Sequence, residues 1–165
     1  MNIAVLLHGS GVYDGTEIHE AVFSLLALAE AGHEYQCFAP NITQHHVINH
    51  LDGSEMNEER NVLIESARIA RGQIKDLQEI KASDFDALMM PGGFGTAKNI
   101  TKWAFEGPSG DILPELKSLI LDFAGTSSFV NNQNSGELNQ KLVSIKMQFP
   151  KIKSLLESSL KIDWI

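Results

Sequence analysis

Cysteine is almost absent from this 165-residue sequence: Cys37 is the only one, so no internal disulfide can form. Disulfides are rare in reducing compartments, and we therefore expect a cytoplasmic protein. Long apolar runs are also missing, because no stretch approaches the roughly 18 residues that a membrane-spanning helix needs. The short apolar run at the amino terminus lacks the basic flank of a signal peptide and is typical of a first strand.

Positive charge is scarce as well, with 13 Lys and Arg against 21 Asp and Glu. A net charge of −8 argues against an electrostatic grip on nucleic acid or on a membrane surface, so we expect neither as a partner. Residues 1–123 carry the acidic excess, whereas residues 124–165 hold five basic and three acidic side chains. We divide the chain into a body, residues 1–123, and a divergent tail, residues 124–165, which begins with a polar joint and is predicted to be helical beyond it.

Apolar periodicity in the body alternates between strand and helix. The run "NIAVLL" ends before Gly9 and predicts a buried strand, and residues 17–31 carry apolar side chains at helical spacing after Thr16, a candidate N-cap. Further strands are predicted at 35–40 and 84–90, and further helices at 56–71 and 113–124. Such alternation predicts an α/β fold with right-handed crossovers and a parallel sheet covered on both faces.

Glycines gather after two of the predicted strands, at 9–15 and at 92–95. Parallel sheets bind ligands at the carboxyl ends of their strands, so we expect the two loops to be adjacent and to contact substrate. The predicted substrate-binding residues are Gly9, Ser10, Gly11, Gly92 and Gly95. Their spacing matches neither a dinucleotide fingerprint nor a phosphate loop, so we expect no cofactor.

Two features of these loops permit more than one interpretation. Glu20, in the first turns of a helix, is either a solvated acid favoured by the helix dipole or a general base in a cleft. The Pro91-Gly92-Gly93 segment either offers backbone N–H groups to a substrate oxygen or is simply a strand-to-helix turn.

The histidines suggest a second kind of site. His45, His46 and His50 lie close together in the sequence, but no cysteine or acidic cluster completes a ligand set, so we expect a polar loop and no metal. His19 is predicted to be a surface or partner residue.

Five blocks of the body together resemble the ElbB branch of the ThiJ/PfpI superfamily of class I glutamine amidotransferase-like proteins: "GSGVYDGTEIHEAV", "CFAPN", "HVINHLDG", "RNVLIESARIARGQI" and "MMPGGFGTAKNI". The resemblance covers residues 1–123 only. It implies a flavodoxin-like, three-layer α/β sandwich with a parallel sheet, and a homodimer. It also implies a cofactor-independent glyoxalase activity, from glyoxal or another 2-oxoaldehyde to a hydroxy acid, and a link by name to isoprenoid biosynthesis.

The resemblance also assigns roles to two residues. A helix glutamate assists a nucleophilic cysteine in that superfamily, and the matching position here is Glu20, as base. The Pro-Gly-Gly block supplies an oxyanion-binding amide, which here is the N–H of Gly93.

The chain departs from the family pattern where the nucleophile belongs. The family cysteine follows the helix that matches residues 113–123, yet no cysteine follows Cys37, and Ser10 replaces the cysteine of an early Gly-Cys-Gly. We expect a sandwich truncated or altered at its carboxy-terminal end, with a tail that is either a replacement or a frame-shifted or rearranged sequence.

Neither remaining nucleophile is promising. Cys37 lies within a predicted strand, where a lone cysteine is usually a small buried hydrophobe, and Ser10 has no evident base. We therefore predict a glyoxalase-like protein that is inactive or impaired because the nucleophilic cysteine is missing, and that binds a small carbonyl or carboxylate compound. The alternative is a non-catalytic small-molecule-binding or protein-interaction module. Apolar side chains of residues 138–165 are predicted to cover a sheet face left open.

Overall fold

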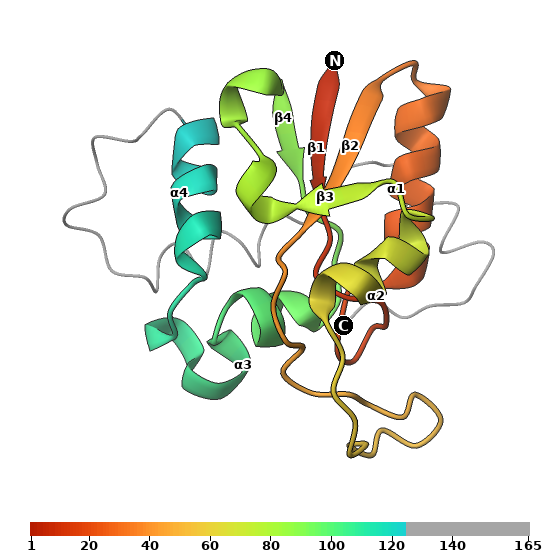
Figure 1. Ribbon diagram of the computed structural model, residues 1–165, viewed down its shortest axis with the longest axis vertical. Helices are drawn as coiled ribbons and strands as arrows, with labels where there is room; N and C mark the ends of the chain where they lie inside the picture. The colour runs from red at the N-terminus through yellow and green to blue at the C-terminus, as the bar shows by residue number, and fades with distance from the viewer. Residues whose placement is uncertain (125–165) are drawn as a thin grey trace.

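Four parallel strands run through the centre of the computed structural model, which describes residues 1–124 (Figure 1). They are β1 (Asn2–Leu6), β2 (Glu34–Ala39), β3 (Ile74–Asp76) and β4 (Ala87–Met89), in the sheet order β3-β2-β1-β4. Val5 of β1 is paired with Cys37 on one side and with Met89 on the other. The predicted α/β class with a parallel sheet is confirmed.

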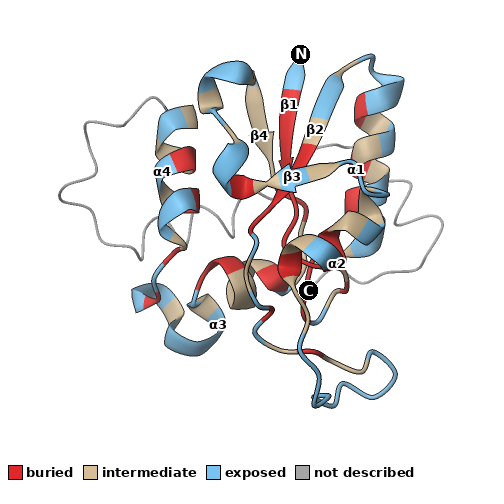
Figure 2. Cartoon of the chain, viewed as in Figure 1, coloured by how far each residue is buried: buried red, intermediate tan, exposed pale blue. Residues whose placement is uncertain are grey.

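Side chains alternate along β1 and so create a core on each face of the sheet. Ala4 and Leu6 belong to one core, with Leu116 and Leu119 of α4 (Pro114–Phe123). The other core contains Ile3 and Val5 of β1 and the following Leu7, together with side chains of α1 (Ile18–Glu30) and α2 (Val62–Ile69). The sheet is therefore the middle of three layers, and its buried positions lie on β1 and on the second half of β2 (Figure 2).

The start of α1 differs from the sequence prediction. Glu17, and not Thr16, is the N-cap, and its Oε2 accepts a hydrogen bond of 2.7 Å from the N–H of Glu20. Thr16 is buried, and its hydroxyl accepts the N–H of His8 at 2.8 Å. Because the Thr16 hydroxyl binds the backbone just after β1, it does not cap α1. Glu17 caps the helix instead.

The predicted helix over residues 56–71 was too long. Asn61 caps α2 by accepting the N–H of Ile64, and the preceding residues form a loop. Backbone bonds from Gln44 to Arg60 and from Met56 to Val47 hold that loop to the segment after β2. Contacts distant in sequence therefore override the helical pattern.

Several short elements were not predicted. Strand β3 has three residues with a lysine at its centre, so it shows no apolar run. Beyond β4, Thr96–Ile100 is a π-helix and α3 (Trp103–Glu106) is a single turn. Single 3-10 turns occur at Leu77–Glu79, Ala82–Asp84 and Gly107–Ser109.

Residues 125–165 are outside the described part of the chain. The predicted tail helix, the cover provided by residues 138–165 and the altered nucleophile segment all lie there. Within residues 1–124, no helix has the length and apolar character needed to cross a membrane.

Candidate functional site

The two glycine loops meet at the carboxyl ends of β1 and β4, as predicted. Three backbone hydrogen bonds join them: Phe94 N–H to Val12 O at 2.8 Å, Gly95 N–H to Gly15 O at 2.9 Å, and Glu17 N–H to Gly92 O at 2.8 Å. Residues about 80 positions apart therefore form one continuous edge, and α1 begins directly beside it.

Close backbone packing explains several of the glycines. A Cβ on Gly9 would lie 2.8 Å from Gly15 Cα, and one on Gly95 would lie 2.7 Å from the same atom. A Cβ on Gly11 would be 2.7 Å from Asp14 Oδ1 and from the ring of His50. The two loops can pack this closely only because glycine has no Cβ at these positions. Substrate contact by Gly9, Ser10, Gly11, Gly92 and Gly95 stays a prediction.

Glu20 faces the opposite loop. Its Oε2 accepts the N–H of Gly92 at 2.7 Å, and the side chain is half-buried. Burial raises the pKa of this carboxyl above its usual value; the Gly92 N–H opposes the shift, and the nearby Glu17 carboxylate adds to it. The simple solvated acid is therefore not what the structure contains. A carboxyl whose pKa is raised holds a proton more readily than a solvated one, as a general base that takes up and returns a proton must.

The two neighbouring amides differ in availability. The Gly92 N–H is occupied by Glu20, so it is not free to bind a substrate oxygen. Gly93 has a φ of +112° and is partly exposed, and none of the hydrogen bonds found among residues 1–124 uses its N–H. A half-buried carboxyl and an unused backbone donor thus lie side by side. The oxyanion role of Gly93 and the base role of Glu20 stay predictions.

His8 is a buried site residue that sequence analysis missed. Desolvation by burial lowers the pKa of its imidazole to about 4, although a bond to the Pro91 carbonyl opposes this, so the ring is neutral at pH 7. Its Nε2 lies 3.0 Å from Pro91 O and 2.9 Å from Thr96 Oγ1. The ring therefore connects the end of β1 to the Pro-Gly-Gly turn.

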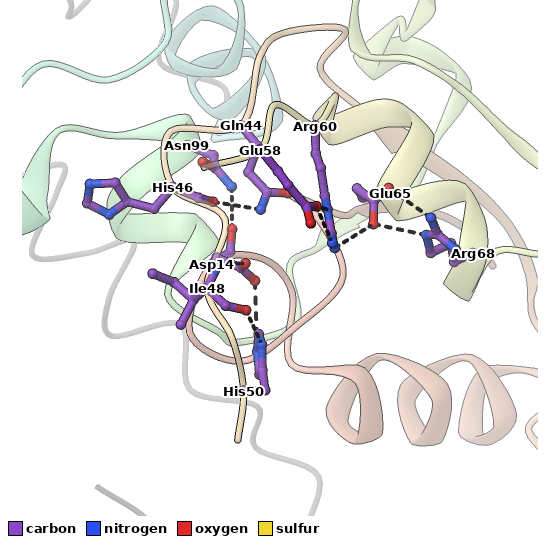
Figure 3. Close-up of polar contacts among 10 residues, drawn as sticks. All are labelled: Asp14, Gln44, His46, Ile48, His50, Glu58, Arg60, Glu65, Arg68 and Asn99. Atoms are coloured by element: carbon purple, nitrogen blue, oxygen red, sulfur yellow. Dashed lines mark hydrogen bonds and ion pairs between the residues drawn. The ribbon is translucent and has the colours of Figure 1, made fainter. Parts of the chain in front are cut away.

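Asn99, in the π-helix, was also missed. Its Nδ2 donates to His8 O at 2.9 Å and to Asp14 O at 2.8 Å, while its Oδ1 accepts the N–H of His45 at 2.9 Å. Asp14 is itself buried and accepts the N–H of Ile48 at 2.7 Å (Figure 3). The amide side chain of Asn99 thus joins the first glycine loop to the segment after β2.

The three histidines after β2, His45, His46 and His50, contact aromatic rings and polar groups. The His45 ring stacks on Phe105 with centroids 4.2 Å apart, and 4.5 Å separates it from the ring of His46. His50 Nδ1 lies 3.0 Å from Ile48 O, and its Nε2 is 3.8 Å from Asp14 Oδ1. On α1, His19 is exposed, as the predicted surface residue would be, and its Nδ1 lies 2.9 Å from Glu17 Oε1.

Cys37 is a buried core residue, as predicted. It belongs to the core beneath α1 and α2, with 2% of its surface exposed, and burial raises the pKa of its thiol to about 11. At pH 7 only about 10⁻⁴ of such a group is thiolate, which is the reactive form. Ser10 is half-buried, and none of the hydrogen bonds in the described part of the chain joins its hydroxyl to a base.

Two cavities lie away from this edge. One of about 440 Å³ is lined by Cys37, Leu25 and Ile69, among others, and one of about 940 Å³ lies beside α4. Neither is lined by Glu20 or by a glycine of the two loops.

Comparison with known proteins identifies relatives of the body. The chain is 48% identical over 122 residues to glutamine amidotransferase-like class 1 domain-containing protein 3, mitochondrial, from Homo sapiens, covering 73% of this chain and 46% of that protein. It is 47% identical over 124 residues to the ES1 protein homolog, mitochondrial, from Rattus norvegicus, covering 74% and 47%. The chain thus spans about half the length of these relatives. Both names place those proteins in mitochondria, whereas the sequence predicted a cytoplasmic location for this chain.

A solved structure gives the same result. The crystal structure of an isoprenoid biosynthesis protein with an amidotransferase-like domain from Ehrlichia chaffeensis superposes with a TM-score of 0.72 at 43% identity, covering 76% of this chain and 59% of that one. No family model matches the sequence.

Proposed function

Because about three quarters of this chain is homologous to the glutamine amidotransferase-like class 1 proteins of the ES1/ElbB-like family, we propose that it binds a small carbonyl or carboxylate compound at the edge formed by Glu20 and Gly93. The observation that supports this most is the 2.7 Å bond from Gly92 N–H to Glu20 Oε2. This bond fixes a carboxyl of raised pKa beside an unused backbone donor.

The chemistry that this edge favours is movement of a proton next to a carbonyl group. A carbonyl oxygen that accepts the Gly93 N–H gains stabilisation as negative charge develops on it. Glu20 is then the group that removes the proton from the adjacent carbon and returns it. Both functions come from this chain's own residues and require no cofactor.

A cofactor-independent glyoxalase needs a further group. A thiolate must first add to the aldehyde to give a hemithioacetal, a base then transfers a proton between the two carbons, and water finally releases the hydroxy acid. Cys37 cannot supply that thiolate, because it is buried in β2 with a pKa of about 11. Removing the nucleophile of such a unit leaves little of the rate. We therefore propose binding with little or no glyoxalase turnover.

Turnover is tested by following glycolate from glyoxal and lactate from methylglyoxal, without glutathione, for the wild type, Cys37→Ala and Glu20→Ala. We expect all three proteins to match the protein-free blank. Robust activity that Cys37→Ala abolishes would contradict the claim that Cys37 is unreactive. Robust activity that survives Cys37→Ala would mean that another nucleophile acts here.

A second role, as an interaction module, is favoured by one feature of α1. Ile18, Val22 and Leu26 recur every four residues on its outer face and are 41%, 45% and 50% exposed. A two-fold axis brings such a stripe against its own copy, so we propose that α1 forms the interface of the expected homodimer.

Light scattering measures this assembly directly. The wild type is expected at twice the chain mass and Val22→Asp at the chain mass, with Glu30→Lys on the same helix as a control that stays dimeric. A monomeric wild type would refute the interface.

A further inference from the structure

We propose that residues 138–165 of this chain dock in the groove beside α4. The groove, of about 940 Å³, lies between α4 and the 3-10 turns that connect β3 to β4. Apolar side chains line it, namely Leu77, Ile80, Ala82, Phe85, Leu119 and Phe123. Four of these, Ile80, Ala82, Phe85 and Phe123, are only partly buried although they pack on the core. Covering them removes apolar surface from water, which is favourable.

The rim of the groove is acidic. Asp86, Glu115 and Asp122 line it together with one cation, Lys81. Asp86 already accepts the N–H of Asn2 at 2.7 Å, whereas no ion pair of residues 1–124 includes Glu115 or Asp122. Asp122 is moreover in the last turn of α4, where the helix dipole favours a cation and no basic residue is present. The groove therefore favours an apolar segment that carries positive charge.

The carboxy-terminal sequence has this composition. Residues 138–165 contain five lysines and two acids, among many large apolar side chains such as Phe149, Leu155 and Leu156. The chain also leaves the described region at the groove itself, because Phe123 both ends α4 and lines the cavity. The 13 residues 125–137 can extend up to about 45 Å, so the segment can reach every part of the groove.

Cross-linking within the full chain tests this placement. Ser118→Cys lines the groove and Ser154→Cys lies in the carboxy-terminal segment, while Cys37 stays buried and unreactive. We expect the double variant to form a disulfide within one chain under mild oxidation. Adding Lys151→Glu and Lys153→Glu should slow that bond at least tenfold, and adding Glu115→Lys and Asp122→Lys as well should restore it. Glu30→Lys on α1, on the opposite face of the sheet, is the control and should leave the rate unchanged.

Amide hydrogen exchange provides a second measurement on the native sequence. Leu155→Asp together with Leu156→Asp should speed exchange around Phe85 and Phe123 at least tenfold while leaving β1 protected. A disulfide that forms only between chains would mean that a second copy occupies the groove. A disulfide insensitive to charge reversal, or groove exchange equal in wild type and variant, would equally overturn the proposal.

Discussion

Gly93→Ala is expected to lower the free energy of unfolding by about 4 kcal/mol, a large share of the roughly 5–15 kcal/mol that stabilises a domain. The glycine has a φ of +112°, which an L-residue rarely adopts, and an added Cβ would collide with Glu17 N, Gly15 O and Thr16 C. All three atoms are backbone atoms of the segment that leads into α1, so the collision cannot be relieved by rotating a side chain. Urea unfolding followed by circular dichroism measures the loss.

Gly72→Ala is the matched control for this change. Gly72 also has a positive φ, of +81°, but a Cβ there would meet no atom within 4 Å. Gly72→Ala should lower the free energy of unfolding only by the backbone strain at this position, of order 1–3 kcal/mol. Equal losses at the two positions would show that the glycine loops are not packed as described.

Asn99→Ala should cost about 3 kcal/mol, because it removes three hydrogen bonds at once. The side chain is partly buried and joins His8 O, Asp14 O and His45 N. Each buried donor or acceptor that is left without a partner lowers the free energy of unfolding by about 1–3 kcal/mol. The control is Asn49→Ala, since Asn49 Oδ1 accepts only the N–H of Leu51 in an exposed turn. That control should change the free energy of unfolding by less than about 0.5 kcal/mol.

Thermal unfolding of both asparagine variants in parallel decides this point. A loss for Asn99→Ala no larger than for Asn49→Ala would contradict the view that Asn99 joins the first glycine loop to the segment after β2. None of the three bonds of Asn99 involves Glu20 or Gly93. A loss of stability in Asn99→Ala would therefore report on the packing of the loops and not on the proposed ligand-binding groups.

The layers of the fold could be predicted because they depend on local patterns. The apolar run of β1, the periodicity of α1 and the glycines at strand ends each follow from their own sequence windows. Strand β3 could not be found this way, since a three-residue strand with Lys75 at its centre gains its identity only from pairing with β2. Likewise, the loop before α2 is held by partners more than eight residues away.

The candidate site was predictable in position but not in its connections. Glu20 could be located by its place on the first helix, yet its bond to Gly92 joins residues 72 positions apart and has no sequence signature. His8 and Asn99 escaped for the same reason, because their partners come together only in the folded sheet. Glycines and polar residues after a strand therefore indicate where a site lies. They do not indicate which side chains will bond to one another there.

Ligand binding at the Gly93 amide tests the central claim most directly. Nuclear magnetic resonance of the ¹⁵N-labelled chain, titrated with glycolate and with neutral glycolaldehyde, follows the Gly93 and Cys37 amides together. We expect both compounds to shift the Gly93 signal and to leave Cys37 unchanged. Because ionised Glu20 repels a carboxylate, glycolate should bind more tightly as the pH falls through the raised pKa of Glu20, whereas glycolaldehyde should change little. In Glu20→Gln this difference should disappear. An unmoved Gly93 signal, or glycolate affinity that has the same pH dependence in wild type and Glu20→Gln, would contradict the proposed site.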